Sequence, residues 1–297
     1  MPTTSTGSSS RRRPATAAAL PPRFVPESPL EIRATLERIG VRPSRALGQS
    51  FLSNPFVADA EAALLELSPG RPVLEIGGGL GAVTAALVRR GIAPLTVVER
   101  DPRLAEFLRS TFGDRIRVLE GDALAVDLPP ADGVVGNLPY SAGTPILLRL
   151  LAARYPKVVF LLQKEVVDRI AAGPGSKQYG RLSIAARLYG DVERFRVVPP
   201  AAFTPEPEVA SRLAVHRARS GALPVPSVPA FERAVRTLFG ERRKQLGNLL
   251  PRLAASREGA DRLARAAGWP VDWASRRPEE LPPEAFFALA RALAPGG

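Results

Sequence analysis

A mostly apolar run at Val73–Ile76 leads directly into the glycine-rich segment Gly77–Gly81, and a helical pattern follows at Ala82–Arg89. A short apolar run bounded by glycines is typical of a buried strand, and the glycines allow the backbone of the turn to approach a ligand closely. The amides at the start of the following helix can then donate hydrogen bonds to that ligand. The segment therefore predicts a strand–turn–helix unit of an α/β fold, with a cofactor site at the turn.

The same turn fits more than one cofactor. Gly77, Gly79 and Ala82 satisfy the G-x-G-x-x-A pattern of dinucleotide-binding proteins, so the turn alone leaves a nicotinamide enzyme open. Two carboxylates at the ends of later strands narrow the choice. Glu99 can accept hydrogen bonds from two ribose hydroxyls, and Asp122 is placed to meet an adenine amino group. A nicotinamide enzyme accounts for Glu99 but does not need Asp122, so the set favours S-adenosylmethionine.

Strand and helix patterns alternate from about residue 30 to residue 220. Alternation of this kind predicts a mainly parallel sheet with helices on both faces. The expected strands are Val73–Ile76, Leu95–Glu99, Ile116–Glu120, Gly133–Asn137, Val158–Leu162, Phe195–Val198 and Leu213–His216, and helices are expected at Ala82–Arg89 and Arg103–Phe112. The last two strands are close in sequence, which favours an antiparallel edge.

The chain divides into three expected parts, which are residues 1–28, residues 29–220 and residues 221–297. The first part is rich in Ser, Thr, Ala and Pro, contains Arg11–Arg13, and has the composition of a disordered basic tail. The second part is the expected α/β catalytic domain. In the third, the proline-rich segment Leu223–Pro229 is followed by apolar positions at helical spacing in Phe231–Phe239 and Phe286–Leu293. This spacing predicts a small all-helical domain.

The composition excludes several kinds of chemistry. The chain has no cysteine, so disulfides, thiolate nucleophiles, Cys-ligated zinc and iron–sulfur clusters are excluded. His216 is the only histidine and alternates with Leu213 and Val215, so it is expected on a strand surface rather than as a catalytic base or a metal ligand. No apolar run approaches the ~18–20 residues of a membrane span.

The net charge is +12 and the isoelectric point is near 11. Such an excess of positive charge favours a polyanionic partner, either nucleic acid or an anionic membrane surface. Solubility alone would also account for it.

The segment Asn137-Leu138-Pro139-Tyr140 ends an expected strand and precedes an apolar helical pattern. Pro139 restricts Leu138 to extended conformations, so the carbonyls of Asn137 and Leu138 need not be used within a helix. Tyr140 offers a flat apolar face on which a base can stack. These parts are suited to holding a flipped purine by its exocyclic amine, and a helix-entry turn with a capping Asn and a packed Tyr is the alternative.

The chain also carries an ordered set of motifs, which are Leu47–Leu52, Glu75–Gly81, Gly121–Ala123, Asn137–Tyr140, Leu162–Arg169, Tyr179–Ser183 and Phe203–Ser211. Together they resemble the ribosomal RNA adenine dimethyltransferase family. The match is closest to the branch that dimethylates two adjacent adenines in a hairpin loop near the 3′ end of small-subunit rRNA. Two positions depart from that branch. Ser50 replaces the usual Asn and alters one hydrogen bond to the cofactor, while Gly78 replaces a frequent Pro and leaves the turn more flexible with the same shape.

The resemblance implies a Rossmann-like S-adenosylmethionine-dependent methyltransferase with a small C-terminal all-helical domain. It implies a monomer that acts in the cytoplasm on small-subunit rRNA or on the immature small ribosomal subunit. The expected cofactor-binding residues are Gln49, Ser50, Leu52, Gly77, Gly79, Glu99, Arg100, Asp122, Ala123 and Asn137. The expected catalytic residues are Asn137, Leu138, Pro139, Tyr140 and Phe203, of which Tyr140 and Phe203 would stack on the base. Neither a metal nor a histidine would be needed.

Three alternatives remain open from the sequence. They are a large-subunit rRNA adenine methyltransferase of the macrolide-resistance type, a methyltransferase for a small-molecule or DNA amine, and a non-catalytic ribosome-assembly or transcription factor on the same fold. The macrolide-resistance relatives usually carry Ile in place of Leu138. The basic excess and the helical domain disfavour a small-molecule acceptor, and the intact Glu99, Asp122 and Asn137–Tyr140 disfavour a loss of activity.

The run Arg242-Arg243-Lys244 is expected at the start of a helix, where the helix dipole disfavours cations. An arrangement that costs helix stability indicates an anion that meets these cations, so the run is expected to contact RNA phosphates. A solvated basic face is the alternative. The segment Gln163–Glu165 is expected to form a helix cap with a structural salt bridge and to take no part in acid–base chemistry.

Overall fold

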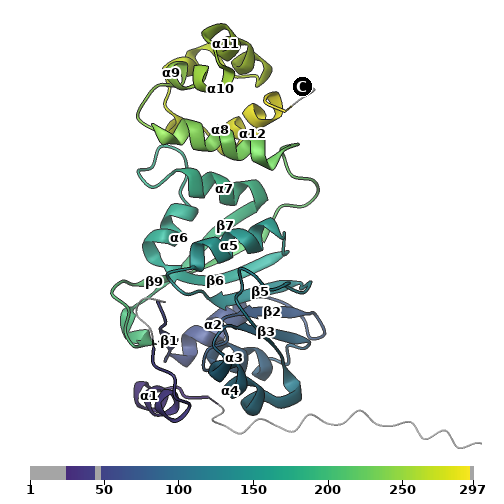
Figure 1. The fold of residues 1–297 in the computed structure, drawn as a ribbon, viewed down its shortest axis with the longest axis vertical. Helices are drawn as coiled ribbons and strands as arrows, with labels where there is room; N and C mark the ends of the chain where they lie inside the picture. The colour runs from purple at the N-terminus through teal and green to yellow at the C-terminus, as the bar shows by residue number, and fades with distance from the viewer. Residues whose placement is uncertain (1–24, 44–47, 295–297) are drawn as a thin grey trace, which may run out of the picture.

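The structure is a computed structural model that describes residues 25–43 and 48–294. Most of the expected tail, residues 1–28, and Leu47 of the Leu47–Leu52 motif therefore lie outside the described residues. The described chain forms an elongated molecule, with the sheet in its lower half and a layer of C-terminal helices at the opposite end (Figure 1).

A seven-stranded sheet forms the centre of the α/β part. Its parallel strands are β2 (Val73–Ile76), β3 (Leu95–Glu99), β4 (Arg117–Glu120), β5 (Gly133–Asn137) and β6 (Lys157–Gln163), and its antiparallel edge consists of β7 (Gly190–Val198) and β9 (Ser211–Ala218). The strand order is β4-β3-β2-β5-β6-β9-β7, with β9 antiparallel to both of its neighbours. The predicted fold class is confirmed, and each expected strand is present; β7 begins earlier than expected, at Gly190.

Alternate residues of the central strands pack against helices on opposite faces of the sheet. Val73 and Val97 pack in one core cluster with α2 (Pro55–Leu64), α3 (Ala82–Arg89) and α4 (Pro102–Phe112). Leu74 and Ile76 pack in another with α5 (Gly143–Ala152), α6 (Lys164–Ile170) and α7 (Arg181–Tyr189). Burial on both faces explains why these strands read as continuous apolar runs. Because β2 to β6 pair in parallel, their carboxyl ends lie along one edge of the sheet, where ligands bind in open α/β folds.

His216 is buried in β9, so the expectation that it lies on a strand surface is wrong. It is paired with Val158 of β6 on one side and with Val192 of β7 on the other. Burial lowers the pKa of His216 to about 4, against a smaller opposite effect of Asp191, so the ring is neutral at physiological pH. The apolar residues near His216 in the sequence resemble the pattern of a strand with one exposed face. In the structure, β9 lies inside the sheet, between β6 and β7.

Five C-terminal helices form one layer, and they are α8 (Val228–Gly240), α9 (Leu246–Leu249), α10 (Pro251–Ala254), α11 (Arg257–Ala266) and α12 (Pro283–Ala292). The two helices predicted in this part correspond to α8 and α12. The layer shares a core cluster with Tyr179, Ile184 and Leu188 of the α/β part. Tyr179 is fully buried there and donates a hydrogen bond from its hydroxyl to the carbonyl of Leu281 at 2.9 Å. The helical layer therefore packs directly on the face that carries α7, as Figure 1 shows.

The basic run Arg242–Lys244 does not start a helix. It lies in a turn after α8, which ends at Gly240, and before α9, which begins at Leu246. Cations just past the C-terminal end of a helix are favoured by its dipole, so the expected cost to helix stability is absent.

The N-terminal part of the described chain covers the glycine turn. Helix α1 (Pro29–Arg38) begins at Ser28, whose side chain and that of Glu31 form a capping box. Its residues Ile32 and Leu36 pack in a cluster with Phe51 and Leu80. Phe51 belongs to β1 (Phe51–Leu52), which pairs antiparallel with β8 (Phe203–Thr204). Within residues 25–43 and 48–294, no helix combines the length and the apolar character needed to cross a membrane.

Candidate active site

The glycine turn between β2 and α3 adopts backbone conformations that favour glycine. Gly77 and Gly79 have φ angles of 79° and 53°, both in the left-handed region. This path points the amide of Gly79 at the carboxylate of Glu99, to which it donates a hydrogen bond at 2.9 Å. This hydrogen bond links the glycine turn to the end of β3, and both line the same pocket.

Glu99 ends β3 with its side chain buried. Its two carboxylate oxygens accept hydrogen bonds from the amides of Gly79 and Asp101, each at 2.9 Å. Burial raises the pKa of Glu99, and the backbone hydrogen bonds oppose this effect. Each carboxylate oxygen has a second lone pair, so Glu99 keeps the capacity to accept a hydrogen bond from a ligand hydroxyl.

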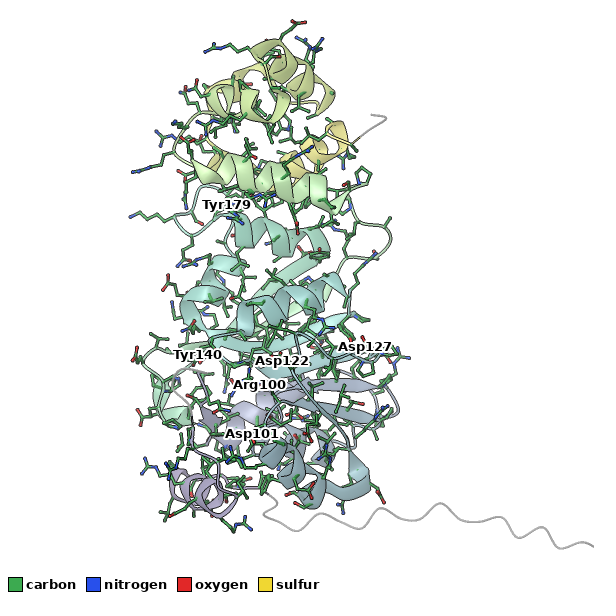
Figure 2. The ribbon with its side chains drawn as sticks, viewed as in Figure 1. Arg100, Asp101, Asp122, Asp127, Tyr140 and Tyr179 are labelled. Carbon is green, nitrogen blue, oxygen red and sulfur yellow. The ribbon has the colours of Figure 1, made fainter. Side chains whose placement is uncertain are left out.

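Asp122 follows β4, and one of its oxygens accepts a hydrogen bond from the amide of Leu124 at 2.8 Å. Its other oxygen lies 3.7 Å from a guanidinium nitrogen of Arg100. Figure 2 places Asp122, Arg100 and Tyr140 in the region where the strands of the sheet end. The Asp122 loop is also attached to α5, because Arg149 donates hydrogen bonds to the carbonyls of Ala123 and Val126.

The segment Asn137–Tyr140 begins at the last residue of β5 and leads toward α5, and its residues make different contacts. The amide of Leu138 donates to the carbonyl of Leu161 at 3.1 Å, which extends the pairing of β5 with β6. The Tyr140 hydroxyl is 2.5 Å from the hydroxyl of Ser211, the first residue of β9. Within residues 25–43 and 48–294, the side chain of Asn137 has no hydrogen-bond partner. Its amide oxygen is therefore available to a ligand.

The segment Gly48–Leu52, which precedes the sheet in the chain, forms one wall of the pocket. Gly48 has a φ of 62°, and a Cβ at this position would lie 3.1 Å from both the amide nitrogen and the Cβ of Tyr140. Only a glycine can therefore bring this backbone against the Tyr140 turn without strain. Leu52 pairs with Phe203 in the short β1–β8 ladder, so Phe203 is fixed beside the pocket.

The segments described above line one pocket at the carboxyl edge of the sheet. Every residue predicted to bind the cofactor or the acceptor lines it: Gln49, Ser50, Leu52, Gly77, Gly79, Glu99, Arg100, Asp122, Ala123, Asn137, Leu138, Pro139, Tyr140 and Phe203. Arg242, Arg243 and Lys244 are not among its lining residues, since they lie in the C-terminal helical layer. The described residues contain no group of His, Asp and Glu side chains that could hold a metal ion.

Residues 42–263 match the family described as ribosomal RNA adenine dimethylase. The chain belongs to the ribosomal RNA adenine dimethylase family. Two relatives are a ribosomal RNA small subunit methyltransferase A from Anaeromyxobacter dehalogenans (strain 2CP-C) and one from Methylibium petroleiphilum. The first is 41% identical over 284 residues, which cover 88% of this chain and 97% of the relative. The second is 43% identical over 266 residues, which cover 85% of this chain and 97% of the relative.

Solved structures show the same fold. A dimethyladenosine transferase from Plasmodium falciparum matches with a TM-score of 0.71 and 23% identity, over 80% of this chain and 95% of that chain. The 23S rRNA methyltransferase ErmE matches with a TM-score of 0.62 and 26% identity, over 82% of this chain and 99% of that chain. The expected Rossmann-like methyltransferase fold with a helical C-terminal region is thus confirmed for this member of the adenine dimethylase family.

The sequence analysis missed two buried acidic residues, of which Glu75 lines the dimethylase pocket and Glu61 lies in α2 outside the pocket lining. Glu75 lines the pocket, is buried, and accepts a hydrogen bond from the Thr84 hydroxyl at 2.7 Å. Glu61 of α2 is fully buried, and neither of its carboxylate oxygens has a hydrogen-bond partner among the described residues. Burial raises the pKa of each carboxyl to about 8, and the charge of Glu75 adds to the effect on Glu61. An isolated Glu in an amphipathic helix resembles a solvent-facing residue, so only the packing reveals this pair.

Gln163, Lys164 and Glu165 take the structural roles expected of them, with one difference. Gln163 is the N-cap residue of α6, but its side chain makes no capping hydrogen bond. The expected salt bridges are present, from Lys164 to Asp168 at 2.6 Å and from Arg169 to Glu165 at 2.9 Å.

Proposed function

We propose that this protein transfers methyl groups from S-adenosylmethionine to the exocyclic N6 of two adjacent adenines in a hairpin loop near the 3′ end of small-subunit rRNA. The product is N6,N6-dimethyladenosine, formed in the cytoplasm during ribosome maturation. The family match and the relatives named ribosomal RNA small subunit methyltransferase A, at 41% and 43% identity over nearly their whole length, support this substrate.

The pocket fits S-adenosylmethionine, whose sulfonium supplies an activated methyl group when the cofactor is bound. Glu99 would accept hydrogen bonds from its ribose hydroxyls, and the Asp122 oxygen that lies 3.7 Å from Arg100 would accept one from its adenine amine. The Gly77–Gly79 turn and the segment Gln49–Leu52 would hold its methionine end. Hydrogen bonds to charged acceptors are strong, so the buried carboxylate of Glu99 and the partly exposed carboxylate of Asp122 would together select an adenosine.

The acceptor base would enter beside Asn137. The Asn137 amide oxygen and the Leu138 carbonyl would accept the two N–H groups of the adenine amine, which turns its lone pair toward the methyl group. Tyr140 and Phe203 would stack on the base, and such stacking is worth ~1–3 kcal/mol per base. Catalysis would then consist of positioning and the exclusion of water, and no titratable base is required for the transfer.

The observation that carries this proposal is the unpartnered Asn137 side chain in a pocket that also contains Glu99, Asp122 and Tyr140. A purely structural cap would use the Asn side chain internally, and a non-catalytic factor would not need an open acceptor at this edge. The structure of the large-subunit enzyme ErmE is also similar, but at 26% identity, well below the small-subunit relatives.

The N-terminal and C-terminal parts have assigned roles in this proposal. Residues 29–220 form the catalytic domain and residues 221–297 form an RNA-binding helical domain. The expected basic tail, residues 1–28, is too long at its end, because Val25 is buried in the core of the catalytic part and Ser28 caps α1. In the helical domain, Arg242 is paired with Glu279 and Lys244 with Glu241, whereas Arg243 is exposed and has no ion pair among the described residues. Arg243 is therefore the member of the run best placed to contact a phosphate.

Mass spectrometry of small-subunit rRNA from cells that lack this protein tests the proposal. The expected result is that N6,N6-dimethyladenosine is missing from the 3′ hairpin and returns when the wild-type protein is supplied. A normal level of dimethyladenosine in the small subunit, with a loss in the large subunit, would support the macrolide-resistance type of activity instead.

A further inference from the structure

Asp168 of α6 is a nearly buried carboxylate that contacts three cations. Its side chain is 8% exposed, and it lies 2.6 Å from the Lys164 ammonium, 3.2 Å from the Arg212 Nε and 3.8 Å from a guanidinium nitrogen of Arg194. The three cations come from α6, β9 and β7, so the contact depends on the tertiary fold. We call Lys164, Arg194 and Arg212, together with Asp168, the Asp168 cluster.

The cluster contains more positive charge than a structural ion pair needs. One carboxylate neutralises one cation, so two positive charges remain in the cluster. The Lys164 and Arg194 side chains are 46% and 48% exposed, which leaves donor groups facing solvent. Arg212 Nε and the nearer Asp168 oxygen are both buried but do not form a hydrogen bond with each other or with another described residue. These two buried atoms are paired with each other at 3.2 Å, so the donors that remain available to an anion are the exposed ones of Lys164 and Arg194.

The position of the cluster connects it to the acceptor side of the pocket. Lys164 follows the carboxyl end of β6, on the same edge of the sheet as Asn137. Ser211, which precedes Arg212, pairs with Gln163 and holds the Tyr140 hydroxyl at 2.5 Å. In the shared view of Figures 1 and 2, Tyr140 and the label of β9 lie on the same, left side of the molecule. An adenine stacked on Tyr140 would thus have its sugar–phosphate chain leaving the pocket near these cations.

We propose that the Asp168 cluster binds backbone phosphates of the single-stranded RNA segment that flanks the adenine in the pocket. This inference rests on the proposed function. Guanidinium groups bind phosphate oxygens through paired N–H donors, and Asp168 holds the cations in place before the RNA arrives. Phosphate contacts fix the register of the substrate without reading its bases, so the cluster positions the acceptor and takes no part in the chemistry.

The test is a double variant, Lys164→Gln with Arg194→Gln, which removes the two exposed cations and keeps similar side-chain lengths. Binding to an RNA hairpin with the small-subunit 3′ sequence is measured by fluorescence anisotropy over a series of KCl concentrations. The slope of log affinity against log salt should decrease by ~0.7 for each lost contact, or about 1.4 in total. KM for the RNA should rise, while the affinity for S-adenosylmethionine stays at its wild-type value.

Two further variants separate this role from a structural one. Arg71→Gln removes a cation of an ion pair with Asp132 at the opposite, amino edge of the sheet, and it should leave the salt slope unchanged. Asp168→Asn keeps all three cations and should give a wild-type or steeper slope. A double variant with a wild-type slope and affinity overturns the inference, and so does a result in which Asp168→Asn and the double variant only lower the melting temperature. If the wild-type protein methylates no small-subunit RNA, this result contradicts the proposed function, and the inference that rests on it is overturned as well.

Discussion

At the scale of single residues, the proposed selection of the cofactor rests on Glu99. Glu99→Gln keeps the shape of the side chain but removes the charge from an acceptor that already holds two backbone amides. Because hydrogen bonds to charged groups are worth about 1.5–3 kcal/mol, we expect the affinity for S-adenosylmethionine to fall at least tenfold. Isothermal titration calorimetry measures this directly. An unchanged dissociation constant would remove Glu99 from the cofactor site.

Gly78 is required by packing. A Cβ at this position would lie 2.4 Å from Cγ1 of Val97 and 2.7 Å from Cδ1 of Leu108. A side chain at this position would need Val97 or Leu108 to move, and Val97 is fully buried and stiff at χ1. We predict that Gly78→Ala lowers the free energy of unfolding by ~1–3 kcal/mol.

Chemical denaturation of a double-mutant cycle checks this prediction. Val97→Ala creates space for the new methyl group, so the double variant should be less destabilised than the sum of the single changes. Additive effects would show that the clash is relieved elsewhere.

The buried pair Glu61 and Glu75 gives the stability of the protein a pH dependence. Their folded-state pKa values of about 8 lie above the ordinary value of 4.5, so the folded state binds more protons between these limits. The free energy of unfolding should therefore decrease as the pH rises from 4.5 to 8, by roughly 1 kcal/mol per pH unit for each group.

Glu61→Leu tests the origin of this pH dependence. The variant replaces a carboxyl without partners by an apolar side chain of similar size, and it should remove about half of the slope and raise the melting temperature most at pH 8. Thermal unfolding at several pH values provides the measurement. A slope equal to that of the wild type would show that Glu61 does not carry the proton.

At the scale of secondary-structure elements, the turn between α8 and α9 contains cations with different partners. Arg242 contacts Glu279 at 2.5 Å and the carbonyl of Lys177 at 3.2 Å, so it joins the helical layer to the α/β part. Arg243 is exposed. Arg242→Ala should thus destabilise the fold by about 1 kcal/mol, as expected for a partly exposed pair.

Arg243→Ala should instead leave the melting temperature unchanged and decrease the salt slope of RNA binding by ~0.7–0.9, the effect of one lost phosphate contact. Differential scanning fluorimetry and salt-dependent binding measured on both variants separate the two roles. If Arg243→Ala binds RNA as the wild type does, the helical layer docks through another surface.

Local sequence patterns could predict those strands and helices whose limits are set by residues close in the sequence. The strand ends at Glu99 and Asn137 and the helices α3 and α4 are marked by apolar runs and by Gly or Pro, and the structure confirms them. The burial of His216 depends on strand order, which no local pattern contains. Likewise, Glu61 becomes buried only when α2 packs on α3, and β1 and β8 are too short to be recognised before Leu52 and Phe203 are brought together.

At the scale of the whole molecule, the site joins segments that are far apart in the chain. The pocket takes residues from Gly48 to Phe203, and the helical layer packs on the opposite side of α7 through Tyr179. The motifs could indicate which residues share a site, because the carboxyl ends of parallel strands meet at one edge. The packing of the helical layer could not be predicted in this way, since it depends on tertiary contacts such as that between Tyr179 and Leu281.

Methylation of small ribosomal subunits that lack dimethyladenosine tests the central claim most directly. Purified wild-type protein and the Asn137→Ala variant are each incubated with these subunits and S-adenosylmethionine, and the rRNA nucleosides are quantified by mass spectrometry. The wild type should form N6,N6-dimethyladenosine at two adjacent positions in the 3′ hairpin. Asn137→Ala should be slower by on the order of 10²-fold with nearly unchanged cofactor affinity, because it loses an acceptor that orients the amine. Equal rates for the two proteins, or dimethyladenosine formed only in large-subunit rRNA, would contradict the account.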